Sequence, residues 1–144
     1  MSFLPDVNVW LAAAWARHVH HDPAKQWIDE ADARIHLCRV TQMALLRLLS
    51  SPAVLGDDAL TRAAAWRAID QLRSDPRITW MQEPAQLEVL WRTMSSRTDL
   101  SHKLWTDDYL AAFAQTAGLT LVTFDQALEQ RHPSVDVTIL KPRR

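Results

Sequence analysis

The stretch TDDYLAAFAQTAGLTLVTFD, residues 106–125, decides the fold class of this chain. Thr106 can cap a helix whose middle consists mainly of small and apolar residues, and Gly118 suits the left-handed turn that ends a helix. The apolar run 119–124 is typical of a buried strand, and it ends on Asp125. A helix that leads directly into a buried strand indicates an α/β unit, with a carboxylate at the carboxyl end of the strand.

The same alternation continues along the rest of the chain. The apolar start breaks at Pro5–Asp6 and then takes on helical spacing, which predicts a short strand and a helix. Asp22 would cap a helix running from Pro23 to about Ala31, and Thr41 would cap a later one. Helical spacing recurs in 42–51, 59–75 and 83–97, and strand-like runs occupy 33–40, 77–81 and 135–140.

Strands that alternate with helices throughout predict one α/β domain over residues 1–144. Its sheet should be mainly parallel, with helices on both faces. In such sheets ligands bind beyond the carboxyl ends of the strands. Polar residues at those ends are therefore the first candidates for a functional site.

Composition limits the chemistry that this chain can perform. A single cysteine, Cys38, excludes internal disulfides and a cysteine-based zinc site, and its apolar neighbours predict a buried thiol. The net charge of −1 provides no overall basic field, so a nucleic-acid partner would need a local basic patch. No segment resembles a membrane span or a signal peptide, so no membrane association and a cytoplasmic location are expected.

Three aspartates occupy positions where a ligand is expected. Asp6 and Asp125 follow predicted strands, and Asp107 lies in the first turn of a helix. Any one of them alone would be read as a capping or turn residue. Together they form an oxygen-only set that suits Mg²⁺ or Mn²⁺, and such a site is suited to phosphate chemistry.

The residues around these aspartates carry a family resemblance. Asn8 lies two residues after Asp6, and Thr123 lies two before Asp125. With LPDVNVWLAA, CRVTQMALLRLLSSPAV and the stretch quoted above, the sequence strongly resembles PIN-domain nucleases, and within them the VapC-type toxins of bacterial toxin–antitoxin pairs. The resemblance covers nearly the whole chain. It implies a three-layer α/β/α sandwich and a metal-dependent ribonuclease that hydrolyses RNA phosphodiesters.

The resemblance also implies roles and partners. Asp6, Asp107 and Asp125 would be catalytic and bind Mg²⁺ or Mn²⁺, while Asn8 and Thr123 would support them or contact phosphate. A homodimer and a small antitoxin protein would be the partners. One departure concerns the glutamate that the family commonly carries on the helix after the second strand, because Ala44 stands at that position here and Gln42 is the nearest polar alternative.

Several alternatives stay open at this point. Asp108 could replace Asp107, and the missing glutamate leaves room for a PIN-like domain that binds RNA or protein without cutting it. A receiver domain would also place acids at strand ends, but Lys141 lies too late in the chain for that reading. His18, His20 and His21 with Asp22 could ligate zinc, although HVHHDP is typical of a polar turn.

Basic and aromatic residues supply the remaining candidates. Arginine and lysine side chains around an acidic cleft could contact RNA; the candidates are Arg17, Arg39, Arg47, Arg97 and Lys103. Four tryptophans at apolar helix positions are expected in the core, namely Trp10, Trp27, Trp66 and Trp91. Trp15 and Trp105 are expected at an interface or against RNA.

Overall fold

The computed structural model describes residues 1–142 and contains a five-stranded sheet in the order β3-β2-β1-β4-β5. The strands are β1 Ser2–Pro5, β2 Arg34–Leu37, β3 Ile78–Trp80, β4 Thr120–Thr123 and β5 Val137–Ile139. All four pairs of neighbouring strands are parallel. The predicted parallel sheet is confirmed, and the carboxyl ends of all its strands meet at one edge.

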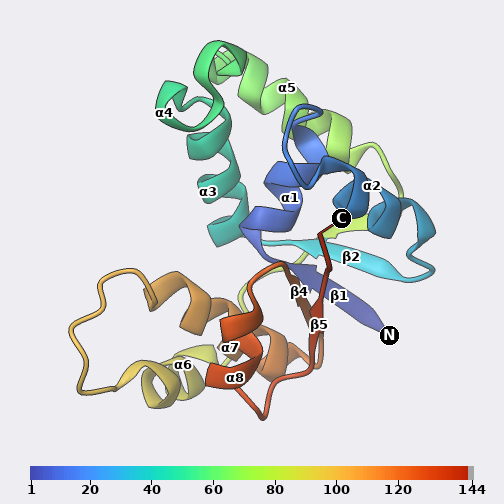
Figure 1. Cartoon of the computed structure of the whole chain (residues 1–144). Helices are drawn as coiled ribbons and strands as arrows, with labels where there is room; N and C mark the ends of the chain where they lie inside the picture. The colour runs from blue at the N-terminus through green and yellow to red at the C-terminus, as the bar shows by residue number, and fades with distance from the viewer. Residues whose placement is uncertain (143–144) are drawn as a thin grey trace.

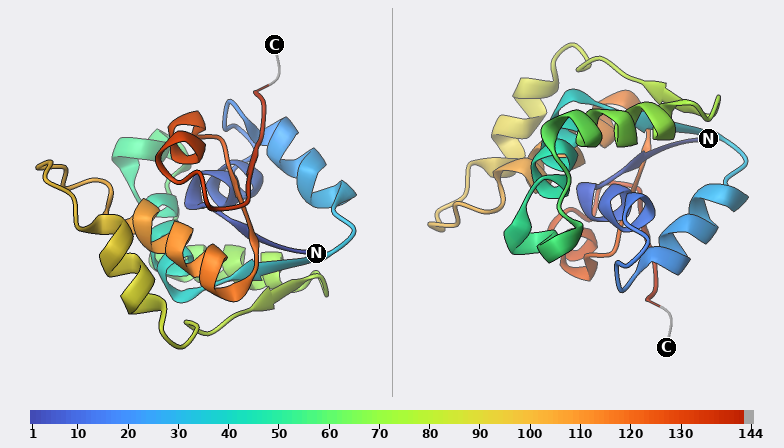
Figure 2. Two further views of the ribbon diagram at one scale, coloured as in Figure 1. Left: turned by 90° about the horizontal axis from the view of Figure 1, so that it is seen from below. Right: turned by 90° about the horizontal axis from the view of Figure 1, so that it is seen from above.

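Helices cover both faces of the sheet (Figures 1 and 2). One layer contains α1 Val7–Ala14, α2 His21–Glu30, α3 Arg39–Leu49 and α5 Arg62–Arg73, with the short α4 Pro52–Leu55 and the 3-10 turn η1 Gly56–Asp58 after α3. The other layer contains α6 Leu87–Ser95, α7 Trp105–Ala117 and α8 Gln126–Arg131. The three-layer α/β/α sandwich is therefore confirmed.

Each layer encloses its own core against the sheet. In β1, Phe3 faces the core under α1, while Leu4 faces the core under α7; in β4, Val122 and Leu121 divide in the same way. Because successive strand residues point to opposite faces, a strand buried on both faces consists almost entirely of residues that tolerate burial, and it lacks an alternating polar face. This explains why the strand before Asp125 has no polar alternation.

Three helix starts differ from their sequence-based predictions. α2 begins at His21, so Asp22 lies in its first turn and does not cap it. α3 begins at Arg39, and Thr41 lies inside the helix, where its hydroxyl donates to the Cys38 carbonyl at 3.0 Å. α7 begins at Trp105, one residue ahead of the predicted cap Thr106. A capping side chain contributes only about 1 kcal/mol, so the geometry of the preceding loop decides where each helix starts.

Other expectations have mixed outcomes. Gly118 ends α7 with a φ of 70°, as predicted, and Cys38 is buried. Trp10 is fully buried, but Trp66 is 49% exposed, so its expected place in the core was wrong.

α4, η1 and α8 were not predicted from the sequence, since each spans fewer than seven residues and lacks a clear apolar period. Within residues 1–142, no helix combines the length and apolar character needed to cross a bilayer.

Candidate functional site

The centre of the site is Thr123, the last residue of β4, whose side chain is completely buried. Its hydroxyl donates to Asp6 Oδ2 at 3.2 Å. The Thr123 hydroxyl oxygen also accepts two hydrogen bonds, from the Asn8 side-chain amide at 3.3 Å and from the backbone N–H of Asp125 at 3.0 Å. One hydroxyl thus ties the loop after β1 to the loop after β4, and its burial limits Thr123 to supporting the residues around it.

Asn8 completes this connection between the two loops. Its side-chain oxygen accepts the backbone N–H of Phe124 at 3.4 Å, while its amide donates to Thr123. Asn8 lies in the first turn of α1, directly after Asp6 and Val7. β1 and β4 are neighbours in the sheet, with Pro5 paired to Val122, so the two loops emerge side by side.

Asp6 is a buried carboxylate with excess negative charge around it. It caps α1, and its Oδ1 accepts the backbone N–H of Val7 at 2.6 Å. Burial, and then the neighbouring carboxylates of Asp107 and Asp125, raise the pKa of Asp6 to about 6, although the bonds from Val7 and Thr123 act in the opposite direction. Desolvation and like charges both disfavour the ionised form, so this carboxylate would gain from a nearby cation.

Asp107 lies in the first turn of α7, and its carboxylate faces the end of α8. Burial raises its pKa, the Arg131 guanidinium lowers it, and Asp125 and Asp108 raise it again. Arg131 Nη2 lies 3.3 Å from Asp107 Oδ2, with both side chains about one quarter exposed. Arg131 is the only basic partner of the three aspartates among residues 1–142, so it neutralises only part of their charge.

Asp125 caps α8, the helix that the sequence did not predict. Its Oδ1 accepts the backbone N–H of Ala127 at 3.0 Å. The capping role and the position beside Asp6 and Asp107 are compatible, because a carboxylate has a second oxygen and further lone pairs. We call Asp6, Asp107 and Asp125 the aspartate site.

Asp108, the sequence-based alternative to Asp107, points elsewhere. Its Oδ1 lies 2.7 Å from Nε2 of His132, and both side chains are buried. This pair and the Arg131–Asp107 pair join consecutive residues at the end of α8 to consecutive residues at the start of α7. Asp108 therefore fastens the two helices together, and Asp107 is the residue that reaches the aspartate site.

The donor set fits a divalent cation, but the ligands are not assembled in advance. Among residues 1–142, no three His, Cys, Asp or Glu side chains are placed to hold a metal ion. The site nevertheless offers oxygen donors alone, which hard cations prefer, and burial, followed by the charges of Asp107 and Asp125, raises the pKa of Asp6. To hold Mg²⁺, such an arrangement would need further oxygen ligands from water or substrate.

The two residues considered for the missing glutamate have different surroundings. Gln42 is buried in α3, and its side-chain oxygen accepts a bond from Arg39 Nη1 at 2.5 Å. Ala44 is half-buried on the same helix. Neither supplies an anionic oxygen, so the aspartate site has three carboxylates of its own.

The basic residues proposed for RNA contact are not gathered at one place. Arg17 lies beyond the far end of α1 and pairs with Asp58 at 3.2 Å. Arg39 begins α3 at the carboxyl edge of the sheet and stacks over the Trp80 ring at 4.6 Å. Arg47 is exposed in α3, and Lys103 is exposed in the loop before α7. The fifth candidate, Arg97, lies in the loop after α6, and its Nε donates to the Met94 carbonyl at 2.9 Å. Of the five, Arg39 and Lys103 belong to segments that start at or lead into the carboxyl edge.

The histidine segment considered for zinc serves the structure. His18 Nδ1 accepts the backbone N–H of His20 at 2.9 Å, and His21 Nδ1 contacts the Ala12 carbonyl at 2.8 Å. The His20 ring stacks on Phe124 with 5.0 Å between centroids. This polar turn therefore packs against the loop that carries Asp125.

Arg131 and His132 were missed by the sequence analysis. Both lie at the end of α8, and they contact residues 24 positions earlier in the chain. The only signal was the polar segment QALEQRH directly after the third aspartate. It is too short for a reliable helical period, so the positions of its charges could not be derived.

Known proteins are similar in sequence to this chain over almost its whole length. The PIN domain family model matches residues 3–132. Ribonuclease VapC41 of Mycobacterium tuberculosis is 45% identical over 133 residues, which cover 88% of this chain and 91% of that protein. Ribonuclease VapC29 of the same organism is 30% identical over 139 residues, covering 96% and 97%.

Solved structures show the same fold at low sequence identity. VapBC2 from Rickettsia felis, bound to a DNA fragment from its promoter, superimposes with a TM-score of 0.70 at 12% identity, covering 98% of this chain and 100% of that chain. VapC20 of Mycobacterium tuberculosis, a toxin that cleaves the Sarcin-Ricin loop, has a TM-score of 0.68 at 18% identity, covering 89% and 93%.

Proposed function

This chain belongs to the PIN-domain family, and from that premise we propose that it is a divalent-metal-dependent endoribonuclease, the toxin of a toxin–antitoxin pair. The observation that carries the proposal is the placement of Asp6 beside Asp107 and Asp125; burial first, and then these two carboxylates, raise the pKa of Asp6 to about 6. Carboxylates placed together without balancing positive charge destabilise the folded protein, and such groups are commonly found at functional sites. Three carboxylates placed together are stabilised by a bound cation, and Mg²⁺ or Mn²⁺ held by carboxylates is suited to reactions of phosphate groups.

Each residue of the site has its own role in the proposed reaction. Asp6, Asp107 and Asp125 hold Mg²⁺ or Mn²⁺ through carboxylate oxygens. With such an ion bound, these carboxylates would hold a source of metal-activated water and of positive charge beside the scissile phosphate. Thr123 and Asn8 fix the two loops, so that Asp6 and Asp125 keep their relative positions. Arg131 holds the Asp107 carboxylate in place beside them.

The partners follow from the relatives. VapBC from Salmonella typhimurium has been solved bound to DNA, with a TM-score of 0.69 to this chain. We propose a small antitoxin protein and a second copy of this chain as partners. Residues 1–144 act as a single PIN domain in this proposal, and the substrate RNA places its action in the cytoplasm.

The test is RNA cleavage by matched aspartate variants. Asp125→Asn and Asp6→Asn keep the capping oxygen of each helix, because asparagine caps as well as aspartate. Both should fold but lose at least about a hundredfold in rate, since removing an anionic ligand costs several kcal/mol of transition-state stabilisation. Asp70→Asn, an exposed change on α5, is the control and should retain full activity. Full activity in Asp125→Asn would overturn the assignment of that residue.

A non-cleaving PIN-like protein is the second candidate, and the alanine at position 44 is the observation that favours it. The two proposals differ in one outcome. A protein that binds RNA but leaves it intact at saturating Mg²⁺ and Mn²⁺ would establish the second and exclude the first.

A further inference from the structure

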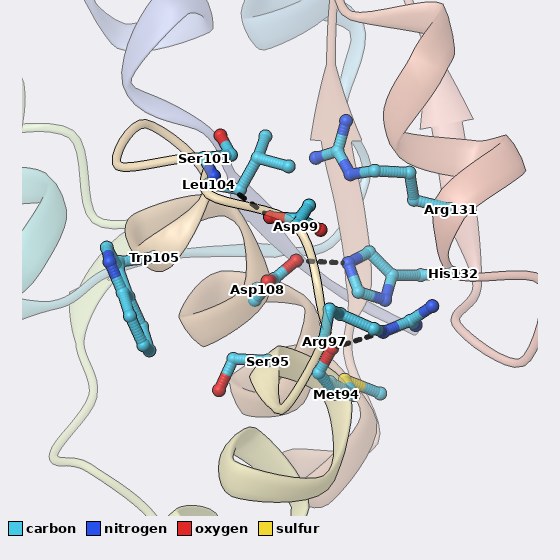
Figure 3. A pocket seen from close by; sticks show the side chains of 10 residues that line it. All are labelled: Met94, Ser95, Arg97, Asp99, Ser101, Leu104, Trp105, Asp108, Arg131 and His132. Carbon is cyan, nitrogen blue, oxygen red and sulfur yellow. Dashed lines mark hydrogen bonds and ion pairs between the residues drawn. The ribbon is translucent and has the colours of Figure 1, made fainter.

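A cleft lies beside the aspartate site, and none of the three aspartates lines it. It has a volume of about 130 Å³ and lies between the end of α6, the loop 96–104, the start of α7 and the end of α8 (Figure 3). We call it the arginine cleft, because Arg97 and Arg131 line it. This volume is well below the roughly 300 Å³ of a small-molecule pocket, but it has room for a group the size of a phosphate.

Arg97 is the basic residue of the arginine cleft that has no carboxylate partner among residues 1–142. The two acids that line the cleft bond to other groups, since Asp108 pairs with His132 at 2.7 Å and Asp99 accepts the backbone N–H of Ser101 at 3.0 Å. Arg97 donates only its Nε, to the Met94 carbonyl at 2.9 Å, and its terminal nitrogens meet no acceptor among residues 1–142. The walls therefore present an unpaired guanidinium to any molecule that enters.

Arg131 supplies a second unsatisfied donor. Its Nε is buried and has no hydrogen-bond partner among residues 1–142, while its Nη2 reaches Asp107. A buried donor without an acceptor is costly, so such groups are commonly completed by a ligand or a water molecule. In Figure 3, Arg131 and Arg97 flank His132, and Trp105 stands on the other side of Asp108.

We propose that the arginine cleft binds a phosphodiester group of RNA next to the one that is cut. This inference rests on the proposed function, because Arg131 contacts both the cleft and Asp107 and so places the two sites side by side. Guanidinium groups bind phosphate oxygens through paired N–H donors. Arg97 contacts the phosphate from the loop, and Arg131 contacts it from α8.

Trp105 extends this subsite to the neighbouring base. Its side chain is 55% exposed at the wall of the cleft, at the first residue of α7. The Trp91 ring meets it edge-on at 6.4 Å, and Trp91 Nε1 donates to the Trp105 carbonyl at 3.2 Å, so its position is supported from behind. An exposed indole ring offers a flat surface on which any RNA base can stack.

The experiment measures RNA binding without cleavage. A fluorescent single-stranded RNA of about eight nucleotides is titrated with the Asp125→Asn protein, which keeps the α8 cap, and anisotropy is recorded at several salt concentrations. Arg97→Gln in this background should weaken binding about tenfold, and the salt slope should fall by about 0.7, as expected for one lost phosphate contact. Trp105→Leu should weaken binding about tenfold with no change in salt slope.

Arg67→Gln is the matched control, because Arg67 is an exposed arginine on α5, on the opposite face of the sheet. It removes the same charge and should change affinity by less than about twofold. Equal losses in Arg97→Gln and Arg67→Gln would overturn the subsite, since they would reflect net charge alone. An unchanged affinity in Arg97→Gln would also overturn it.

A second arm separates RNA from free phosphate. Inorganic phosphate, compared with chloride at equal ionic strength, should displace RNA from the protein that has Arg97 but have no specific effect on Arg97→Gln. Equal displacement from both proteins would contradict a phosphate contact at Arg97. Failure of the proposed function is distinguishable, because it would appear as RNA that the natural protein leaves uncut at saturating Mg²⁺ and Mn²⁺, whatever the binding results.

Discussion

Replacing Asp6 by asparagine should make the protein more stable while removing its activity. Asp6 has a pKa raised from 3.8 to about 6 by burial and by the charges of Asp107 and Asp125. A shift of about two units corresponds to roughly 3 kcal/mol of unfavourable free energy in the folded protein once the carboxylate is ionised. Asparagine removes this charge and keeps the bond to the Val7 N–H.

One hydrogen bond reduces this gain. Thr123 donates to Asp6 and already accepts two bonds, from Asn8 and from the backbone of Asp125. An asparagine that turned its amide toward Thr123 would find no free lone pair, which costs about 1 kcal/mol. The expected net stabilisation by Asp6→Asn is therefore about 2 kcal/mol at pH 8.

The pH dependence follows from the direction of the shift. Because the folded pKa is above the unfolded one, protonated Asp6 favours the folded state fully below pH 3.8, and this contribution is lost as the pH rises through about 6. The advantage of Asp6→Asn should therefore appear between pH 4 and 6 and be complete above it. Below pH 4 the variant should be slightly less stable than the natural protein.

Urea unfolding at pH 4 and pH 8, in EDTA, measures both values. Asp70→Asn removes an exposed carboxylate and should change the free energy of unfolding by less than about 0.5 kcal/mol at either pH. If Asp6→Asn is destabilised at pH 8, or if its effect is the same at both pH values, then Asp6 is not held in an environment of excess negative charge, and the reasoning fails.

Three further predictions concern the surroundings of the site. Ala44→Glu should tighten Mg²⁺ binding in calorimetric titration and lower the Mg²⁺ concentration needed for cleavage, because Mg²⁺ gains from each added anionic oxygen; equal affinities would show that residue 44 does not face the site. Asp108→Ala should cost about 2–3 kcal/mol in urea unfolding, since it leaves buried His132 without its partner; a loss below about 0.5 kcal/mol would contradict the fastening role. Gly118→Ala should lower stability by about 1 kcal/mol, from backbone strain alone, because its φ is 70° and an added Cβ would meet no atom within 4 Å; an unchanged melting temperature would refute this.

The elements with strong local signals could be predicted from the sequence. The run 119–124 contains only apolar residues and two threonines because β4 is buried on both faces, and Gly118 is needed where α7 ends with a positive φ. Asp6 and Asp125 could be placed together because parallel strands share a carboxyl edge, and β1 and β4 are neighbours. These features depend on one segment at a time or on a rule of topology.

The features that the sequence did not reveal depend on contacts between distant segments. α8 has six residues and is held by the Asp125 cap and the Asp108–His132 pair more than by its own periodicity. The roles of Arg131 and Asp108 depend on how α8 meets α7, which no local pattern encodes. Trp66 has helical spacing typical of a core residue, yet its side chain is 49% exposed on α5.

The central claim is that the aspartate site cuts RNA with a metal-activated water. The most direct measurement is a single-turnover cleavage in ¹⁸O-labelled water with Mg²⁺, comparing the natural protein with Asp125→Asn. Attack by water must place one ¹⁸O atom in the phosphate left at the cut end, and Asp125→Asn or EDTA must abolish the reaction. A 2′,3′-cyclic phosphate without ¹⁸O, formed equally well in EDTA, would show that the ribose 2′-hydroxyl is the nucleophile and would contradict the role given to Asp6, Asp107 and Asp125.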